Sequence, residues 1–400
     1  MVSIGFVYFC SVIKNNYELQ NDGTMKNILS KRTFIVLPLF LFSLHPLWGQ
    51  KSNFKNDICI PGKLYMLSDI RNDVFVEALI KRWRPYNDFV RFSGDCVYSR
   101  KLNRVASVDT PVDGSNMKIE LVNSDEFEII KEKAISICVG KKGIGTQEVT
   151  VQILGDSFVN GAFFRDALLS KNYIPGIKLV GLRNIKNEEG QYDEGRGGWT
   201  VKKYFEIPKG EMTSYHGYMQ PVGEYRYWGS CEFWKNCYKV INGELTDTEI
   251  VYNCGRYDQC ITKFDKETGY LAAPKKNDLM YDNARGSYMV YTEKKWKNVE
   301  VDERKWAFNY RKYLDMWNLD APKFFAQMLG LNDYRDSLTA DYREWNKKIA
   351  EMKESYYKAV PDGKFIILIP CTTCGSLNNI RGDFYVTAEC SHVATAKKYH

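Results

Sequence analysis

Histidine is scarce in this chain, which has four among its 400 residues. Residues 51–145 contain none, and no nucleophile or metal-ligand cluster stands out there. That part therefore offers neither an imidazole base nor a recognisable cluster of metal ligands, and a packing or binding role is expected for it. The chain also has no internal repeat and no low-complexity segment, which argues against a repeat architecture.

A strong excess of one charge is missing as well. The formal net charge is +7, and the first 50 residues carry four bases and two acids, a net charge of +2. The other 350 residues therefore hold 7 − 2 = +5, with acids and bases interspersed. Such a balance is typical of an ordinary solvated surface, so we expect no nucleic-acid partner.

The sequence lacks an apolar run long enough to span a membrane comfortably. Thr33–Leu44 is apolar for about a dozen residues and contains Pro38, whereas a spanning helix needs about 20. A basic stretch after Met25 precedes this run and Gly49 follows it, which is typical of a secretory signal. We expect a leader over residues 1–50 with the true start at Met25, and a secreted or periplasmic protein without an integral membrane span after signal removal. A retained N-terminal anchor is the alternative.

Ten of the eleven cysteines follow this leader, and an even number in an exported chain is compatible with disulfides. Two pairs with five intervening residues lie close together: Cys231 with Cys237, and Cys254 with Cys260. The spacing suggests two local bridges or one pair of cross-bridges. A four-thiolate zinc site is the alternative, although zinc sites usually space their cysteines two to four apart.

The chain divides into two parts after the leader. Alternating runs separated by turn signals predict a small β-sandwich over residues 51–145. The runs are 63–66, 90–93, 118–122 and 134–139. Residues 146–400 are predicted to be α/β, because unbroken apolar runs alternate with helical segments. The predicted strands are 149–154, 178–182, 325–329 and 365–369, and the predicted helices are 158–169 and 338–359.

Ser157 follows the first of these strands directly, in the turn Gly155-Asp156-Ser157, and opens the helix predicted at 158–169. Ligands bind at the carboxyl ends of parallel strands, and a helix N-terminus offers N–H groups to a developing oxyanion. The position therefore suits a nucleophile. A plain turn is the simpler interpretation of the triplet taken alone.

Two further turns near strand ends carry the donors that an attacking serine needs. Glu194–Thr200 has the sequence Glu-Gly-Arg-Gly-Gly-Trp-Thr, and Leu329–Arg335 has Leu-Gly-Leu-Asn-Asp-Tyr-Arg. Gly198 can present a backbone N–H without a side chain in the way, and Asn332 can present an amide N–H. Donors of this kind stabilise the tetrahedral oxyanion of acyl transfer.

These three blocks, in this order, resemble the SGNH (GDSL-type) hydrolase family. The resemblance covers residues 149–370 and implies an α/β, flavodoxin-like three-layer domain, here C-terminally incomplete and preceded by a β-sandwich, as in exported Bacteroidetes-like members. It also implies Ser157 as the nucleophile. The N–H groups of Ser157 and Gly198 and the Asn332 side chain would form the oxyanion hole. No metal or organic cofactor is implied, because this chemistry runs on side chains alone.

The family's fourth block, Asp-x-x-His, is absent. His392 with Glu389 has the right spacing, but too little chain precedes it for the elements that usually come first, and His216 is most simply a loop histidine. A frameshift or premature stop near residue 383 would explain the departure. Without its base, a serine hydrolase loses most of its rate.

The sequence thus predicts an exported serine esterase that hydrolyses carboxylic esters. Residues 201–305 form an insertion rich in Tyr, Trp and Phe, which suggests acetyl groups on a polysaccharide or oligosaccharide as substrate, since aromatic faces pack against sugar rings. An equally good interpretation is that those aromatics pack against one another and form the hydrophobic core of the insertion. Arg196 and Arg335 could contact a substrate carboxylate or phosphate, although surface or interdomain ion pairs are the favoured role.

Two other functions stay open. A truncated or degenerate hydrolase could act only as a carbohydrate-binding protein. Cys371 and Cys374 have redox spacing, but they follow a strand rather than opening a helix, which favours a structural role or free thiols.

Overall fold

The computed structural model describes part of the chain. The described residues are 57–58, 60, 62–68, 71–75, 79–81, 88–95, 97–100, 105–123, 125–140, 148–161, 165, 168–169, 176–183, 192–245, 261–334 and 342–368. Several features predicted above lie outside these residues, namely the leader, the bridge partners Cys254 and Cys260, the Cys371–Cys374 pair, Arg335, the Glu389–His392 pair and the interruption near residue 383.

Residues 57–140 form sheets around one apolar core. One sheet has the order β2–β9–β8–β5 and another β3–β7–β6, while β1 pairs with β4. The strands are β1 (Asp57–Ile58), β2 (Lys63–Leu67), β3 (Asn72–Phe75), β4 (Ile80–Lys81), β5 (Asp88–Gly94), β6 (Val97–Arg100), β7 (Val105–Val108), β8 (Asn116–Asn123) and β9 (Ile129–Gly140). Inward residues of both larger sheets, such as Ile119 of β8 and Val108 of β7, belong to the same buried cluster. The two larger sheets therefore share one hydrophobic core.

A second, parallel sheet carries Ser157. Its strands are β10 (Val149–Gly155), β11 (Ile177–Val180), β12 (Glu194–Gly195), β19 (Phe324–Met328) and β20 (Lys364–Ile367). The order is β11–β10–β19–β20, and the short β12 extends the β11 side by pairing with the last two residues of β10. All these pairings are parallel, so the carboxyl ends of the strands share one edge.

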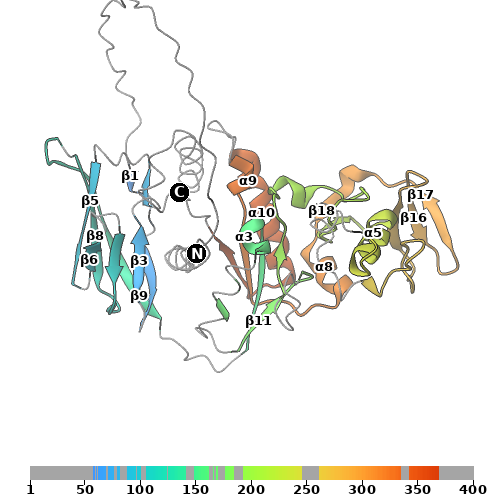
Figure 1. Cartoon of the computed structure of the whole chain (residues 1–400), viewed down its shortest axis with the longest axis horizontal. Coiled ribbons are helices and arrows are strands. Elements are labelled where there is room, and N and C mark those ends of the chain that lie inside the picture. Colours follow the sequence, from blue (N-terminus) through green and yellow to red (C-terminus); the bar gives the residue numbers. More distant parts are fainter. Residues whose placement is uncertain are drawn as a thin grey trace, which may run out of the picture.

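This sheet is buried on both faces, as continuous apolar strands predict. One face holds Val151, Ile153 and Ala326 in a small cluster. The other face contributes Leu154 and Phe325 to a larger cluster, which α10 (Tyr342–Ala359) covers with Trp345, Ile349 and Met352, among others. Figure 1 shows α10 packed along the sheet.

In its described part, the insertion forms a β-rich lobe together with residues 306–317, which follow it and are included with it below. Its elements are η1 (Lys202–Phe205), β13 (Met219–Pro221), β14 (Arg226–Ser230), α5 (Cys231–Ile241), β15 (Asp278–Asp282), β16 (Ser287–Tyr291), β17 (Trp296–Val299), η2 (Glu303–Lys305), β18 (Trp306–Phe308) and α8 (Tyr310–Trp317). Strands β14 to β17 form one sheet, and β13 pairs with β18. Figure 1 shows this lobe extending away from the parallel sheet.

The aromatic side chains of the insertion are its own core. Tyr215, Tyr218, Tyr227, Trp228, Phe233 and Trp234 are all buried. They pack on one another, as Trp234 does on Phe264 at a centroid distance of 3.8 Å. Their faces are therefore not available to a sugar ring, and the support that they gave to a carbohydrate substrate is withdrawn.

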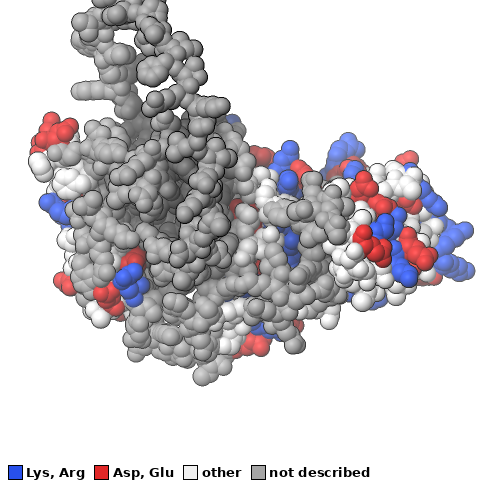
Figure 2. Space-filling model, in the orientation of Figure 1, with Lys and Arg blue, Asp and Glu red and all other residues white. Residues whose placement is uncertain are grey.

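The visible surface of the insertion carries both signs of charge. On the face drawn in Figure 2, basic and acidic side chains intermingle over its described part. Among the described helices, none combines the length and apolar character that crossing a membrane requires.

Two glycines allow the turns at the sheet edge to approach closely. A Cβ at Gly155 would lie 2.8 Å from the carbonyl oxygen of Met328. A Cβ at Gly195 would lie 2.6 Å from the carbonyl carbon of Val159 and 2.7 Å from the Cα of Asn160. Since α3 (Ser157–Asn160) begins with the predicted nucleophile, Gly195 sets the distance between that helix and β12.

We expect Gly195→Ala to destabilise the protein by about 1–3 kcal/mol, because the obstacle is backbone and must shift as a whole. Urea unfolding measures the change. Gly62→Ala is the matched control, since a Cβ at Gly62 meets nothing within 4 Å. Equal midpoints for the two variants would contradict the proposed close approach.

Candidate functional site

Ser157 lies two residues beyond the carboxyl end of β10, and it is exposed. The preceding residue, Asp156, is buried and caps α3, since its Oδ1 accepts a hydrogen bond of 3.1 Å from the backbone N–H of Phe158. This capping satisfies one of the free donors of the first turn. The nucleophile predicted from the sequence therefore stands at a fixed helix start.

Asn332 connects the serine turn with the glycine turn. It belongs to α9 (Leu331–Tyr334), which follows β19. Its Nδ2 donates to the backbone oxygen of Trp199 at 3.1 Å and to Oδ2 of Asp156 at 3.4 Å. The three predicted blocks thus meet at one edge of the sheet. Because both bonds use Nδ2, the amide must release one of them before it can donate to an oxyanion.

Asp333 and Gly198 complete the arrangement. Both carboxylate oxygens of Asp333 accept from the backbone N–H of Val201, at 3.0 and 3.1 Å. Gly198 is exposed and has a φ of 71°, in a turn closed by a 3.2 Å bond from Trp199 N to Arg196 O. A positive φ at this turn position favours glycine, which also leaves the backbone open to a ligand.

The two aspartates at this edge are unusually easy to protonate. Burial raises the pKa of Asp156 to about 6, and the nearby Asp333 carboxylate raises it as well. Burial also raises the pKa of Asp333 to about 6. Perturbed carboxyls of this kind gather at functional sites, although structural networks produce them too.

A buried ion pair lies beneath the glycine turn. Arg196 Nη1 donates to Oε2 of Glu194 at 2.7 Å, and both side chains are at most 1% exposed. Oε1 of Glu194 accepts from Leu182 N and from Tyr313 Oη, each at 2.7 Å. Arg196 also donates to the backbone oxygen of Tyr215 at 3.1 Å. Arg196 therefore takes part in an ion pair, but in a buried one and not in the surface or interdomain pair that the sequence favoured.

The same network reaches the centre of the sheet. Gln152, in β10, donates to Tyr313 Oη at 3.0 Å and accepts from Tyr310 Oη at 2.7 Å. Tyr204 Oη lies 2.8 Å from the backbone oxygen of Gly155 and 2.8 Å from that of Glu194, which share its single hydrogen. These tyrosines tie the insertion to the strand that carries Ser157.

His216 is the one histidine among the described residues, and it is fixed in a neutral form. Its Nδ1 accepts from Tyr218 N at 3.2 Å, so Nε2 carries the proton and donates to the backbone oxygen of Glu206 at 3.1 Å. Burial, together with the charge of Arg196, lowers its pKa to about 3. A histidine with both nitrogens engaged in this way is not a base for Ser157. The candidate pair Glu389 and His392 lies outside the described residues.

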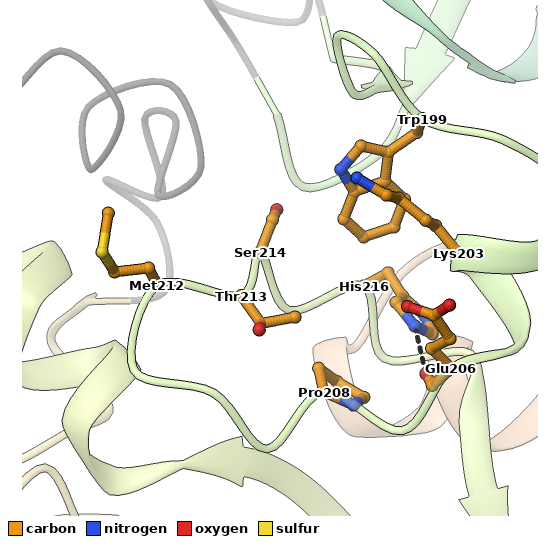
Figure 3. Close-up of a pocket in the computed structure, with 8 residues that line it drawn as sticks. All are labelled: Trp199, Lys203, Glu206, Pro208, Met212, Thr213, Ser214 and His216. Atoms are coloured by element: carbon orange, nitrogen blue, oxygen red, sulfur yellow. Dashed lines mark hydrogen bonds between the residues drawn. The ribbon is translucent and has the colours of Figure 1, made fainter. Parts of the chain in front are cut away.

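A pocket of about 170 Å³ opens next to the glycine turn. It is lined by Trp199, Lys203, Glu206, Pro208, Met212, Thr213, Ser214 and His216. Figure 3 shows Lys203 and Glu206 on one side of it and the loop of residues 212–214 across from them. Trp199 thus contributes to both features, since its backbone oxygen holds Asn332 and its side chain lines the pocket.

The disulfide prediction is wrong for Cys231. This residue is a free, buried thiol at the start of α5, so neither a local bridge nor a cross-bridge forms there. Burial raises the pKa of its thiol to about 12, which makes it unreactive at neutral pH. Within the described ranges, no group of three or more His, Cys, Asp or Glu could hold a metal ion.

Four important residues were not singled out from the sequence: Asp156, Glu194, Trp199 and Asp333. All four lie inside the three predicted turns. An acidic residue beside a glycine or amide in such a turn is a usable signal, because it can hold the backbone of a neighbouring turn. Its partner, however, comes from distant parts of the chain and is not visible in the local sequence.

Comparisons with known proteins add little. No protein-family model and no curated protein matches the chain. One solved structure, a candidate alpha-galactosidase from Bacteroides fragilis NCTC 9343, matches at 9% identity with a TM-score of 0.17. The match covers 78% of this chain and 51% of that chain. A similarity this low carries no argument about fold or function.

We expect Glu194→Leu to destabilise the protein by about 3–5 kcal/mol, because it leaves the Arg196 charge buried without its partner. The double variant Glu194→Leu/Arg196→Met should lose less than the two single variants together, since it removes both charges. Urea unfolding of the three variants measures the coupling. Additive losses would show that the pair is not energetically linked.

His216 should make the protein less stable as the pH falls. The pKa of His216 is about 3 in the folded protein and about 6.5 in the unfolded chain. Below pH 6.5 the unfolded chain binds a proton that the folded protein does not, so the free energy of unfolding falls as the pH is lowered. Between pH 7.5 and pH 5 this loss is about 2 kcal/mol. Asp156 and Asp333 act in the opposite direction, because their raised pKa values favour the folded state at low pH.

The contribution of the imidazole is isolated by subtraction. The difference in unfolding free energy between the wild type and His216→Gln should shrink by about 2 kcal/mol from pH 7.5 to pH 5. A difference that does not change with pH would mean that His216 titrates normally in the folded protein.

Proposed function

We propose that this protein is an exported serine hydrolase of carboxylic esters, of SGNH type, with Ser157 as the nucleophile. The observation that carries the proposal is the position of Asn332, whose amide bonds to the serine turn at Asp156 and to the glycine turn at Trp199. Residues 176 positions apart in the chain thereby meet beside an exposed serine. The strand order β11–β10–β19–β20 adds support, because it corresponds to the order 2-1-3-4 of flavodoxin-like sheets.

The proposed reaction has two half-steps. Ser157 Oγ adds to the ester carbonyl carbon and gives its proton to a base, while negative charge develops on the carbonyl oxygen. The N–H groups of Ser157 and Gly198 and the amide of Asn332 would receive that charge. The alcohol leaves with the proton, and water then attacks the acyl-serine in the same way and releases the acid.

The base in this proposal is His392, oriented by Glu389. Histidine is the usual base for a serine nucleophile, and a carboxylate three residues before it can hold the imidazole in the required tautomer. The engagement of both nitrogens of His216 supports a base from elsewhere in the chain.

For the substrate, we propose acetyl esters on an oligosaccharide or polysaccharide. The insertion aromatics no longer support this choice, because most of those that suggested it are buried. The feature that bears on it is the pocket beside Trp199, which adjoins the proposed oxyanion donor Gly198.

A carbohydrate-binding protein without turnover is the second candidate. Two observations favour it: His216 has both ring nitrogens engaged, and the Asn332 amide already donates to two acceptors. Such a protein would keep the pocket and lose the chemistry.

Hydrolysis of p-nitrophenyl acetate by the chain without its leader tests the catalytic proposal. We expect Ser157→Ala to abolish turnover and Asn332→Ala to lower kcat by about 10²–10³-fold, the usual effect of removing one oxyanion donor. Asn298→Ala, at an exposed position on β17, is the matched control and should leave the rate unchanged. Equal rates for the wild type and Ser157→Ala would instead favour the binding protein.

A further inference from the structure

We propose that the pocket beside Trp199 binds one uncharged, polyhydroxylated ring of the ester substrate, that is, a single sugar unit. The inference rests on the proposed function for its catalytic consequence but not for binding itself. The pocket adjoins the glycine turn, since Trp199 lines it and follows Gly198 directly. A ring seated there would lie beside the turn that carries the proposed oxyanion donor Gly198.

The size of the pocket limits its ligand. Pockets for drug-sized ligands usually measure about 300–1,000 Å³. This one holds about 170 Å³. It therefore accommodates one ring and not a chain of several, and the rest of a polymer would have to extend outward from it.

The charges that line the pocket select an uncharged ligand that both donates and accepts hydrogen bonds. Lys203 supplies a cation and Glu206 an anion, three residues apart. Within the described ranges, neither charged group has an ion-pair partner. Because the two charges cancel, a net charge on the ligand would be repelled by one group as it is attracted by the other. Neighbouring ring hydroxyls can accept from Lys203 and donate to Glu206 at the same time.

The remaining lining adds one more polar group. Thr213 contributes a hydroxyl, whereas Trp199 and His216, in edge contact at a centroid distance of 5.7 Å, are buried and present little of their rings to a ligand. A sugar ring presents C–H groups on its faces and hydroxyls at its rim. The polar side chains that line the pocket match the hydroxyls at that rim.

The inner wall of the pocket is already in place without a ligand. Ser214 Oγ accepts from Arg196 Nε at 3.3 Å and from Arg183 Nη1 at 3.4 Å. His216 is held by two backbone bonds. A preformed wall lowers the entropic cost of binding, so that modest polar contacts suffice for a measurable affinity.

Direct binding tests the pocket without requiring catalysis. In the Ser157→Ala variant, methyl glucoside, methyl galactoside and methyl xyloside are used as probes in saturation-transfer NMR and titration calorimetry. We expect at least one glycoside to bind, and expect Lys203→Met and Glu206→Ala, each added to that variant, to weaken its binding by about tenfold, as the loss of a hydrogen bond to a charged group does.

The matched controls remove the same kinds of charge from residues outside the pocket. Lys202→Met replaces the neighbouring exposed lysine of η1, and Glu211→Ala replaces an exposed glutamate of the facing loop. Neither residue lines the pocket. Both variants should bind the glycoside as the parent does.

A chemical control separates the ring from its hydroxyls. Cyclohexylmethanol, an uncharged ring without ring hydroxyls, should not bind measurably. Binding of cyclohexylmethanol equal to that of the glycosides would overturn the proposal, and so would glycoside binding that Lys203→Met and Glu206→Ala leave unchanged. Failure of all three glycosides to bind would overturn it too.

Turnover then links the pocket to the proposed reaction. With methyl 6-O-acetyl-glucoside as substrate, Lys203→Met and Glu206→Ala should raise KM about tenfold, while kcat/KM for p-nitrophenyl acetate stays within about twofold of the wild type. An equal loss on both esters would overturn the role of the pocket in substrate selection. If no ester is turned over but the glycosides bind as expected, the catalytic proposal fails and the binding site stands.

Discussion

The buried ion pair between Glu194 and Arg196 is the interaction on which the rest of this part of the molecule depends. Removing such charges from water costs several kcal/mol for each ion, and the cost is met only when hydrogen bonds satisfy both groups. Glu194 accepts hydrogen bonds from Leu182, two residues after β11, and from Tyr313 of α8, while Arg196 also donates to the backbone of Tyr215. Sheet, insertion and glycine turn must therefore assemble together, and the folding of the insertion cannot be separated from the position of the proposed oxyanion donor.

At the edge of the sheet, smaller polar side chains also hold separate segments together by hydrogen bonds. Asp156, Asn332 and Asp333 each form a hydrogen bond from the side chain to a backbone atom. The relative positions of the three turns are therefore fixed through the backbone, which is stiffer than a series of side-chain contacts. Burial raises the pKa values of both aspartates, which means that the fold keeps two carboxyls where their charged forms are disfavoured. Burial of carboxyl groups is unfavourable and is typical of functional sites, where stabilising contacts elsewhere in the structure offset its free-energy cost.

The parts of the fold that follow from local pattern could be predicted from the sequence. Unbroken apolar runs located the parallel strands β10, β11, β19 and β20 to within a few residues, and glycine and amide signals located the three turns. The sheet β14–β15–β16–β17 was not predicted, because its aromatic-rich sequence has no clear period. Whether those aromatics face a ligand or one another depends on contacts between distant segments, and for the same reason the free thiol of Cys231 and the partners of Glu194 were not visible.

Trp199 connects substrate binding with the proposed chemistry. Its ring lies 5.2 Å from the guanidinium of Arg196 and packs at its edge against Tyr204, at a centroid distance of 4.9 Å. The wall of the pocket thus rests on the same arginine that neutralises Glu194, and the ring cannot move far without disturbing that pair. A ligand seated against Trp199 therefore meets a rigid surface, and the backbone oxygen of the same residue keeps Asn332 in position. If the proposed substrate binds in the pocket, its binding energy would be available for orienting the ester instead of ordering the protein.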